Sequence, residues 1–131
     1  MQVIIPIQAV FTADEVSKIR SHLDNNADWQ NGNATAGGQA RQVKQNQQLP
    51  LDSKLAQQLG DIILNTLSQH PTFISAALPL RIFPPMFNRY RTGETYGLHV
   101  DNAIRYVPGN STPIRTDLSA TLFLCDPEEY E

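Results

Sequence analysis

Residues 52–69 carry a single apolar stripe, and this stripe constrains the fold of the chain more than any other feature. The apolar residues recur at intervals of three and four: Leu55, Leu59, Ile62, Ile63 and Leu67. This spacing predicts an α-helix from about residue 52 to residue 69, closed by Pro71. A helix that is apolar on one face must cover that face, so we expect it to brace a sheet.

A second helix is predicted near the N-terminus. Thr12 and Glu15 have the spacing of a capping box, in which the hydroxyl accepts from the backbone of Glu15 and the carboxylate reaches back to the backbone of Thr12. One apolar stripe follows over residues 16–23. The first half of the chain is therefore predicted to be helical.

The second half favours strands. Residues 80–83 and 86–90 have the character of extended segments separated by two prolines, and residues 117–124 form an apolar run that fits a strand buried on both faces. Residues 102–113 are rich in turn-forming residues and are predicted to be a loop. Helices followed by strands indicate an α+β class, and 131 residues suffice for one domain with its own core.

A polar stretch joins the two predicted helices. Residues 31–48 are rich in Gly, Gln and Asn and show no helical period, which predicts a loop with a short strand around Val43. Loops of this length are often functional, and the rim or lid of a site and a plain irregular connection are equally open. Lys44 and Asn46 are expected to be exposed polar side chains in it.

Composition and charge exclude several function classes. The net charge is −3 and the Lys and Arg residues are scattered, so no basic stripe is present for nucleic acid or an anionic membrane. No apolar run could span a bilayer, and the first residues lack a positive region and are interrupted by Pro6, so a cytoplasmic protein is expected. Cys125 is the single cysteine, which excludes an internal disulfide and predicts a small buried residue.

The pair His99 and Asp101 is the main candidate for a functional site in the sequence. On an extended strand, side chains two residues apart point to the same face, so an imidazole and a carboxylate can converge on one metal ion. They would supply two of the three ligands of a two-histidine, one-carboxylate Fe(II) site. No histidine follows His99 in the sequence. Taken alone, the two residues are more simply interpreted as a hydrogen-bonded surface pair.

Several blocks around this pair resemble a known family. The likeness covers nearly the whole chain and rests on residues 43–48, 87–90, 94–101 and 115–124, with the pattern Tyr90-x-x-Gly93-x-x-Tyr96-x-x-His99-x-Asp101 at its centre. These blocks are similar to those of the PKHD-type hydroxylases, also described as iron-uptake factors. That group is a bacterial branch of the prolyl-hydroxylase-like Fe(II)/2-oxoglutarate dioxygenases.

The resemblance implies the roles of the site residues. His99 and Asp101 would be Fe(II) ligands, and Tyr90 would donate a hydrogen bond to the co-substrate 2-oxoglutarate, with L-ascorbate as a further cofactor. Phe123 stands where relatives often have a second tyrosine for the co-substrate, and its hydroxyl is missing. The remaining histidine ligand and an arginine for 2-oxoglutarate would follow Glu131, so the 131 residues alone are expected to be inactive.

The resemblance also implies a fold. Residues 1–79 would be a helical support, and residues 80–131 would be the first strands of a double-stranded β-helix, a jelly-roll or cupin-like barrel that is incomplete in this chain. A non-catalytic binding or assembly domain of the same fold is the alternative, and a homo-oligomer could complete the open sheet. No residue specifies the substrate, whether a small molecule or a peptide.

The remaining polar residues have plain interpretations. His22 and His70, in or next to the predicted helices, are expected to be exposed. Arg115 is expected to pair with Asp117 two residues away on a strand.

Overall fold

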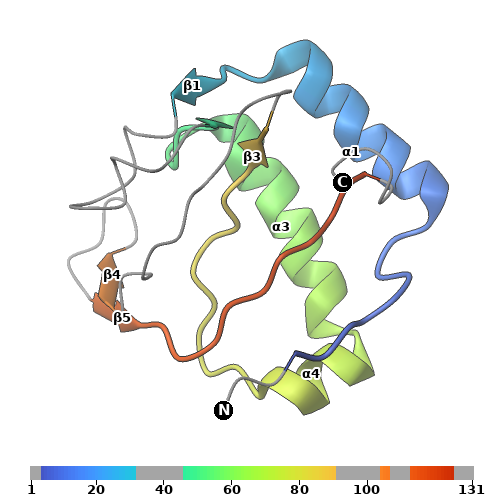
Figure 1. Ribbon diagram of the computed structural model, residues 1–131, viewed down its shortest axis with the longest axis vertical. Coiled ribbons are helices and arrows are strands. Elements are labelled where there is room, and N and C mark those ends of the chain that lie inside the picture. The colour runs from blue at the N-terminus through green and yellow to red at the C-terminus, as the bar shows by residue number, and fades with distance from the viewer. Residues whose placement is uncertain (1–3, 32–45, 91–103, 107–112, 126–131) are drawn as a thin grey trace.

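The protein is a mixed α and β structure with small antiparallel sheets (Figure 1). The computed structural model describes residues 4–31, 46–90, 104–106 and 113–125. Within these residues the elements are α1 (Ala13–Asn26), β1 (Gln30–Asn31), β2 (Gln47–Gln48), α3 (Lys54–Ser68), α4 (Pro71–Ala77), β3 (Asn88–Arg89), β4 (Ile104–Tyr106) and β5 (Pro113–Arg115).

Helix α1 begins at the predicted capping box. The Thr12 hydroxyl accepts a hydrogen bond from the Glu15 backbone N–H at 3.2 Å, and a Glu15 carboxylate oxygen accepts one from the Thr12 N–H at 2.9 Å. These two bonds satisfy backbone donors that the first turn of a helix leaves without partners. Ile19 and Leu23 are buried on the side that faces α3. The predicted helix is confirmed.

Helix α3 confirms the apolar stripe at residues 52–69 to within two residues. The Ser53 hydroxyl caps it by accepting from the Ala56 N–H at 3.3 Å. Leu59 and Ile63 are 4% exposed, whereas Ile62, a member of the same sequence stripe, is 51% exposed. The buried face is therefore narrower than the apolar stripe in the sequence.

Helix α4 was not predicted. Pro71 was expected to close the preceding helix, yet it is also the first residue of α4, a position where the missing N–H is harmless. The His70 imidazole caps α4, because its Nδ1 accepts from the Phe73 N–H at 3.3 Å. His70 is consequently half-buried rather than exposed, while His22 is exposed as predicted.

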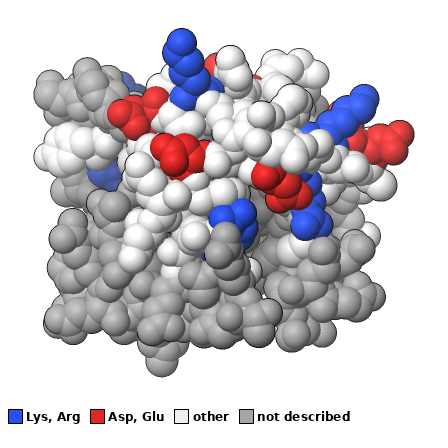
Figure 2. Space-filling model, turned by 90° about the horizontal axis from the view of Figure 1, so that it is seen from above, with Lys and Arg blue, Asp and Glu red and all other residues white. Residues whose placement is uncertain are grey.

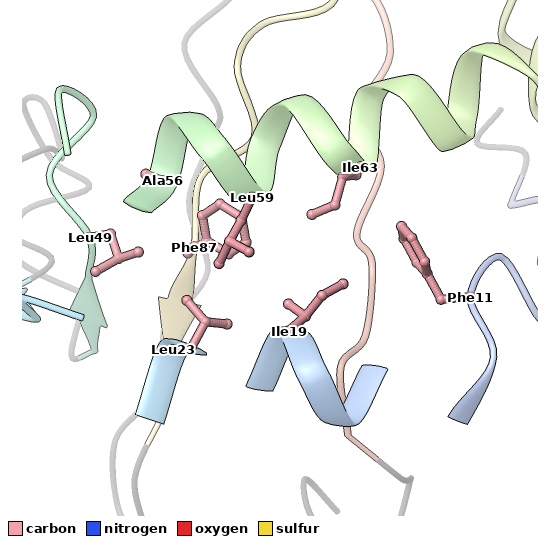
Figure 3. Close-up of a cluster of buried hydrophobic side chains, with 8 residues drawn as sticks. All are labelled: Phe11, Ile19, Leu23, Leu49, Ala56, Leu59, Ile63 and Phe87. Atoms are coloured by element: carbon pink, nitrogen blue, oxygen red, sulfur yellow. The ribbon is translucent and has the colours of Figure 1, made fainter. Parts of the chain in front are cut away.

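The core lies between α1, α3 and the first sheet (Figure 3). Side chains of α1 and α3 point toward one another there, and Phe87 and Leu49 fill the end of the space near β2 and β3. The buried hydrophobic residues are Phe11, Ile19, Leu23, Leu49, Ala56, Leu59, Ile63 and Phe87. The core therefore combines residues from both halves of the chain.

The described residues form two small antiparallel sheets. One has the order β1-β2-β3, with Gln47 opposite Arg89 and Gln48 opposite Asn88. Residues 47–48, predicted as loop, thus form its central strand; the strand predicted around Val43 lies outside the described residues. The described residues close no barrel, so the double-stranded β-helix stays a prediction, as does the division at residues 79 and 80.

The second sheet corrects the prediction that residues 102–113 are a loop. Ile104–Tyr106 pair with Pro113–Arg115, and Tyr106 lies opposite Pro113. A proline is tolerated at the first residue of a strand, which is its position in β5. The Arg105 guanidinium lies 5.5 Å from the centre of the Phe83 ring, so this hairpin contacts the segment before β3.

The prediction of a strand buried on both faces at residues 117–124 is wrong. No strand is assigned to this segment within the described part of the chain. Leu122 and Leu124 pack against the core, but Leu118 is 68% exposed and Phe123 is 57% exposed. The segment runs past α3 as an extended stretch without regular secondary structure (Figure 1).

Charged side chains of both signs share the described part of the surface (Figure 2). Lys and Arg side chains alternate with Asp and Glu over the described part of the face in Figure 2, so no patch of one sign forms there. Among the described residues, no helix has the length and apolar character that crossing a membrane requires.

Candidate active site

Tyr90 is the one predicted site residue that the structure describes. It directly follows β3 and is 48% exposed, so its phenol can reach a ligand at the surface of the sheet. His99 and Asp101, the predicted metal ligands, lie outside the described residues, as do Lys44 and Tyr96. Within the described residues, no group of three or more His, Cys, Asp and Glu side chains could hold a metal ion.

The register of β2 and β3 defines what surrounds Tyr90. Gln47 pairs with Arg89 and Gln48 with Asn88, so the same register continued by one residue places Asn46 opposite Tyr90. Since side chains alternate between faces, Asn46, Asn88 and Tyr90 share one face of the sheet. On this face the Asn46 Nδ2 donates a hydrogen bond to the Asn88 Oδ1 at 3.1 Å.

The opposite face of β3 is anchored by Arg89. Its guanidinium lies 4.4 Å from the centre of the Trp29 ring, a cation–π contact. Its Nε donates to the Gln47 Oε1 at 2.8 Å, and its Nη2 donates to the same oxygen. A backbone hydrogen bond of 3.1 Å from the Leu49 N–H to the Phe87 carbonyl continues the pairing toward the core. Strand β3 is thus fixed on the residues immediately before Tyr90.

Asn46 is buried, which corrects the prediction of an exposed polar side chain. It is 3% exposed, and its Oδ1 has no hydrogen-bond partner among the described residues. A buried amide oxygen without a donor costs about 1–3 kcal/mol of stability. The Trp29 Nε1 is likewise buried and lacks an acceptor within the described part of the chain. Sequence reasoning missed Trp29 and Arg89, because a cation–π pair between distant residues has no local signature.

The residues at the C-terminal side of the described chain take structural roles. Arg115 and Asp117 form the predicted ion pair, with Nε and Oδ1 separated by 3.0 Å, and both side chains are largely exposed. An exposed pair of this kind adds little to stability. Cys125 is half-buried rather than fully buried.

The arrangement can offer hydrogen bonds to a polar ligand. A phenol hydroxyl donates one hydrogen bond and accepts others, and a carboxamide carries both donors and acceptors. Tyr90 places its phenol on this sheet face nine residues before His99, whereas the Asn46 carboxamide on the same face is buried and bonds to Asn88. Tyr90 therefore belongs to the segment that precedes the predicted metal ligands in the sequence.

Comparison with known proteins finds relatives that are named PKHD-type hydroxylases. No family model matches the chain. The chain is 53% identical over 125 residues to a PKHD-type hydroxylase of Herminiimonas arsenicoxydans, covering 95% of this chain and 55% of the relative. It is 51% identical over 128 residues to the PKHD-type hydroxylase PiuC of Pseudomonas aeruginosa, covering 98% and 56%. A PKHD-type hydroxylase of Xanthomonas campestris pv. campestris is 52% identical over 130 residues, covering 98% and 57%.

The matched regions extend over nearly all of the sequence, so they include the segment with Tyr90, His99 and Asp101. The chain spans about half the length of the curated relatives it matches. It is therefore homologous, from near its first residue to near its last, to the PKHD-type hydroxylases.

Proposed function

We propose that the protein is an Fe(II)- and 2-oxoglutarate-dependent hydroxylase when it is complete. The observation that carries this proposal is the identity of about half of all positions to proteins named PKHD-type hydroxylases, across a region that contains the His99-x-Asp101 pair. The names supply the reaction class, and the residue pair supplies the choice of metal. A double-stranded β-helix is the fold we propose for the complete enzyme.

His99 and Asp101 fit Fe(II) by the chemistry of their donor atoms. A neutral imidazole nitrogen and a carboxylate oxygen are two of the three donors in the facial site of non-haem Fe(II) oxygenases. A further histidine would have to come from outside this sequence, in which His22 and His70 belong to α1 and to the cap of α4. When bound, Fe(II) and 2-oxoglutarate would supply the oxidising chemistry that inserts oxygen into a substrate C–H bond.

Tyr90 would orient the co-substrate. Its phenol is 48% exposed at the end of β3, and a hydroxyl donor suits a carboxylate acceptor. The cation–π contact of Arg89 with Trp29 and the Arg89–Gln47 hydrogen bonds hold the backbone next to Tyr90, which limits the positions that the phenol can reach. This is orientation by a rigid support.

Two-residue ligation explains why the 131 residues alone should turn over poorly. One His and one Asp leave the metal geometry undefined, and a co-substrate carboxylate without a buried arginine lacks a bidentate, charge-assisted partner. The test is to incubate the full-length gene product with Fe(II), ascorbate and 2-oxoglutarate and to measure succinate. We expect succinate to form with the full-length protein and to be nearly absent with residues 1–131.

The controls separate chemistry from folding. Tyr90→Phe keeps the ring and removes the hydroxyl, so it should raise the KM for 2-oxoglutarate with a smaller effect on kcat. Absence of succinate from a folded full-length protein would refute the hydroxylase proposal and favour a binding or assembly domain. Succinate formation by residues 1–131 at the rate of the full-length protein would refute the need for further ligands.

A further inference from the structure

A buried carboxamide lies beside Tyr90 and has no task in the function proposed so far. Asn46 is 3% exposed, and it bonds across the β2–β3 pair to Asn88, from Nδ2 to Oδ1 at 3.1 Å. The continued register places Asn46 directly opposite Tyr90, on the same face of the sheet. The Asn46–Asn88 hydrogen bond therefore links strand β3, which Tyr90 directly follows, to the segment that lies opposite Tyr90.

Packing alone does not explain why residue 46 is an asparagine. The side chain is as buried as the core leucines, and its Oδ1 finds no donor among the described residues. An apolar residue of similar volume would avoid that unsatisfied oxygen, and replacing buried polar partners with apolar groups is often neutral or stabilising. Residues that break a packing rule in this way are concentrated at functional sites.

Asn88 is exposed and Asn46 is buried, so the hydrogen bond between them joins an exposed strand to a buried one. Asn88 is exposed at the sheet surface, two residues before Tyr90, whereas Asn46 is fixed in the buried central strand segment. The hydrogen bond fastens the exposed strand to the buried one on the Tyr90 face. The Arg89–Gln47 bonds do the same on the opposite face. Side-chain hydrogen bonds on both faces of the sheet therefore hold strand β3 directly before Tyr90.

We propose that Asn46 is a positioning residue for the co-substrate. It acts through Asn88 to fix the orientation of the Tyr90 side chain at the end of β3. This inference rests on the proposed function, because it assumes that Tyr90 contacts 2-oxoglutarate. Asn46 itself touches no co-substrate. Its effect is to reduce the number of orientations that the Tyr90 phenol explores before 2-oxoglutarate binds.

The test compares co-substrate affinity with stability in the full-length gene product. Calorimetric titration of 2-oxoglutarate into the Fe(II)-loaded protein under nitrogen gives the Kd, and thermal unfolding of the metal-free protein gives the Tm. Asn46→Leu should weaken 2-oxoglutarate binding about fivefold, the equivalent of one lost hydrogen bond, without lowering the Tm. Asn88→Ala, which removes the same bond from the exposed side, should weaken binding by the same factor.

The double variant tests whether the two residues act as one unit. Asn46→Leu combined with Asn88→Ala should bind no more weakly than either single variant, because both remove the same bond. Asn25→Ala is the matched control: it deletes another exposed carboxamide, whose Nδ2 donates to the Ser21 hydroxyl at 3.3 Å on α1. That control should leave the Kd for 2-oxoglutarate unchanged.

Each contrary result has a distinct meaning. A lowered Tm with an unchanged Kd in Asn46→Leu would make Asn46 a structural residue and overturn the inference. If Asn46→Leu does not fold, Asn88→Ala alone decides, and an unchanged Kd in that variant overturns the inference as well. If the wild-type protein does not bind 2-oxoglutarate, the proposed function itself fails and the inference falls with it.

Discussion

Helix α3 offers a stringent test of the packing, because two neighbouring members of its apolar stripe differ in burial. Leu59 is 4% exposed and Ile62 is 51% exposed. Leu59→Ala removes three buried carbons, worth about 2.4 kcal/mol of transfer free energy, and the cavity that remains raises the loss to about 3 kcal/mol. The same change at Ile62 removes three half-buried carbons, worth about 1.2 kcal/mol, and the higher helix propensity of alanine offsets part of that loss.

The predicted loss in free energy of unfolding is therefore about 3 kcal/mol for Leu59→Ala and under about 1 kcal/mol for Ile62→Ala. Urea denaturation followed by circular dichroism at 222 nm measures both values, and unchanged slopes would show that the unfolding reaction is the same. Equal losses at the two positions would refute the arrangement in which α3 turns Leu59 toward α1 and Ile62 toward solvent. A larger loss at Ile62 would require another surface to cover that side of α3.

Two further substitutions test local features in the same assay. Thr12→Ala removes the capping box of α1 and should lower the free energy of unfolding by about 1 kcal/mol; no loss would show that the capping hydrogen bonds do not stabilise the helix start. Gly60→Ala should raise it by about 0.5–1 kcal/mol, because alanine suits a helix interior and the added Cβ would lie 3.4 Å from the Pro85 Cδ, an ordinary contact. A loss there would mean that Pro85 cannot accommodate the methyl group.

The two long helices could be predicted from the sequence because their signals are local. A capping box needs residues three positions apart, and the apolar stripe repeats within the fifteen residues of α3, so neither depends on distant parts of the chain. The bounds differ from the prediction by two residues or fewer at α3. Helix α4 was missed because its seven residues begin directly at the proline that ends α3.

The sheets could not be predicted in the same way. Strands of two or three residues are too short to show a period of two, and β1, β2 and β3 owe their pairing to residues more than fifteen positions apart. The reverse error occurred at residues 117–124. That run is apolar enough for a buried strand, but an apolar run forms a strand only where another strand pairs with it.

The chemistry of the candidate site stays a prediction, and the residues that support Tyr90 could not be predicted from the sequence. Tyr90 could be identified by its place in a pattern of residues that resembles a family. The burial of Asn46 could not be predicted. A polar residue in a polar stretch is expected to be exposed until its hydrogen-bond partner on another strand is known. The Arg89–Trp29 contact has the same origin, since sixty residues separate the two side chains in the sequence.

Fe(II) binding by His99 and Asp101 is the point on which the proposed chemistry depends. Calorimetric titration of Fe(II) under nitrogen into the full-length gene product, its His99→Ala variant and its His22→Ala variant tests it directly. His22 is exposed on α1, so His22→Ala removes an imidazole without touching the proposed site. We expect His99→Ala to abolish stoichiometric binding and His22→Ala to leave it unchanged. Unchanged Fe(II) affinity in a folded His99→Ala variant would contradict the assignment of the metal site.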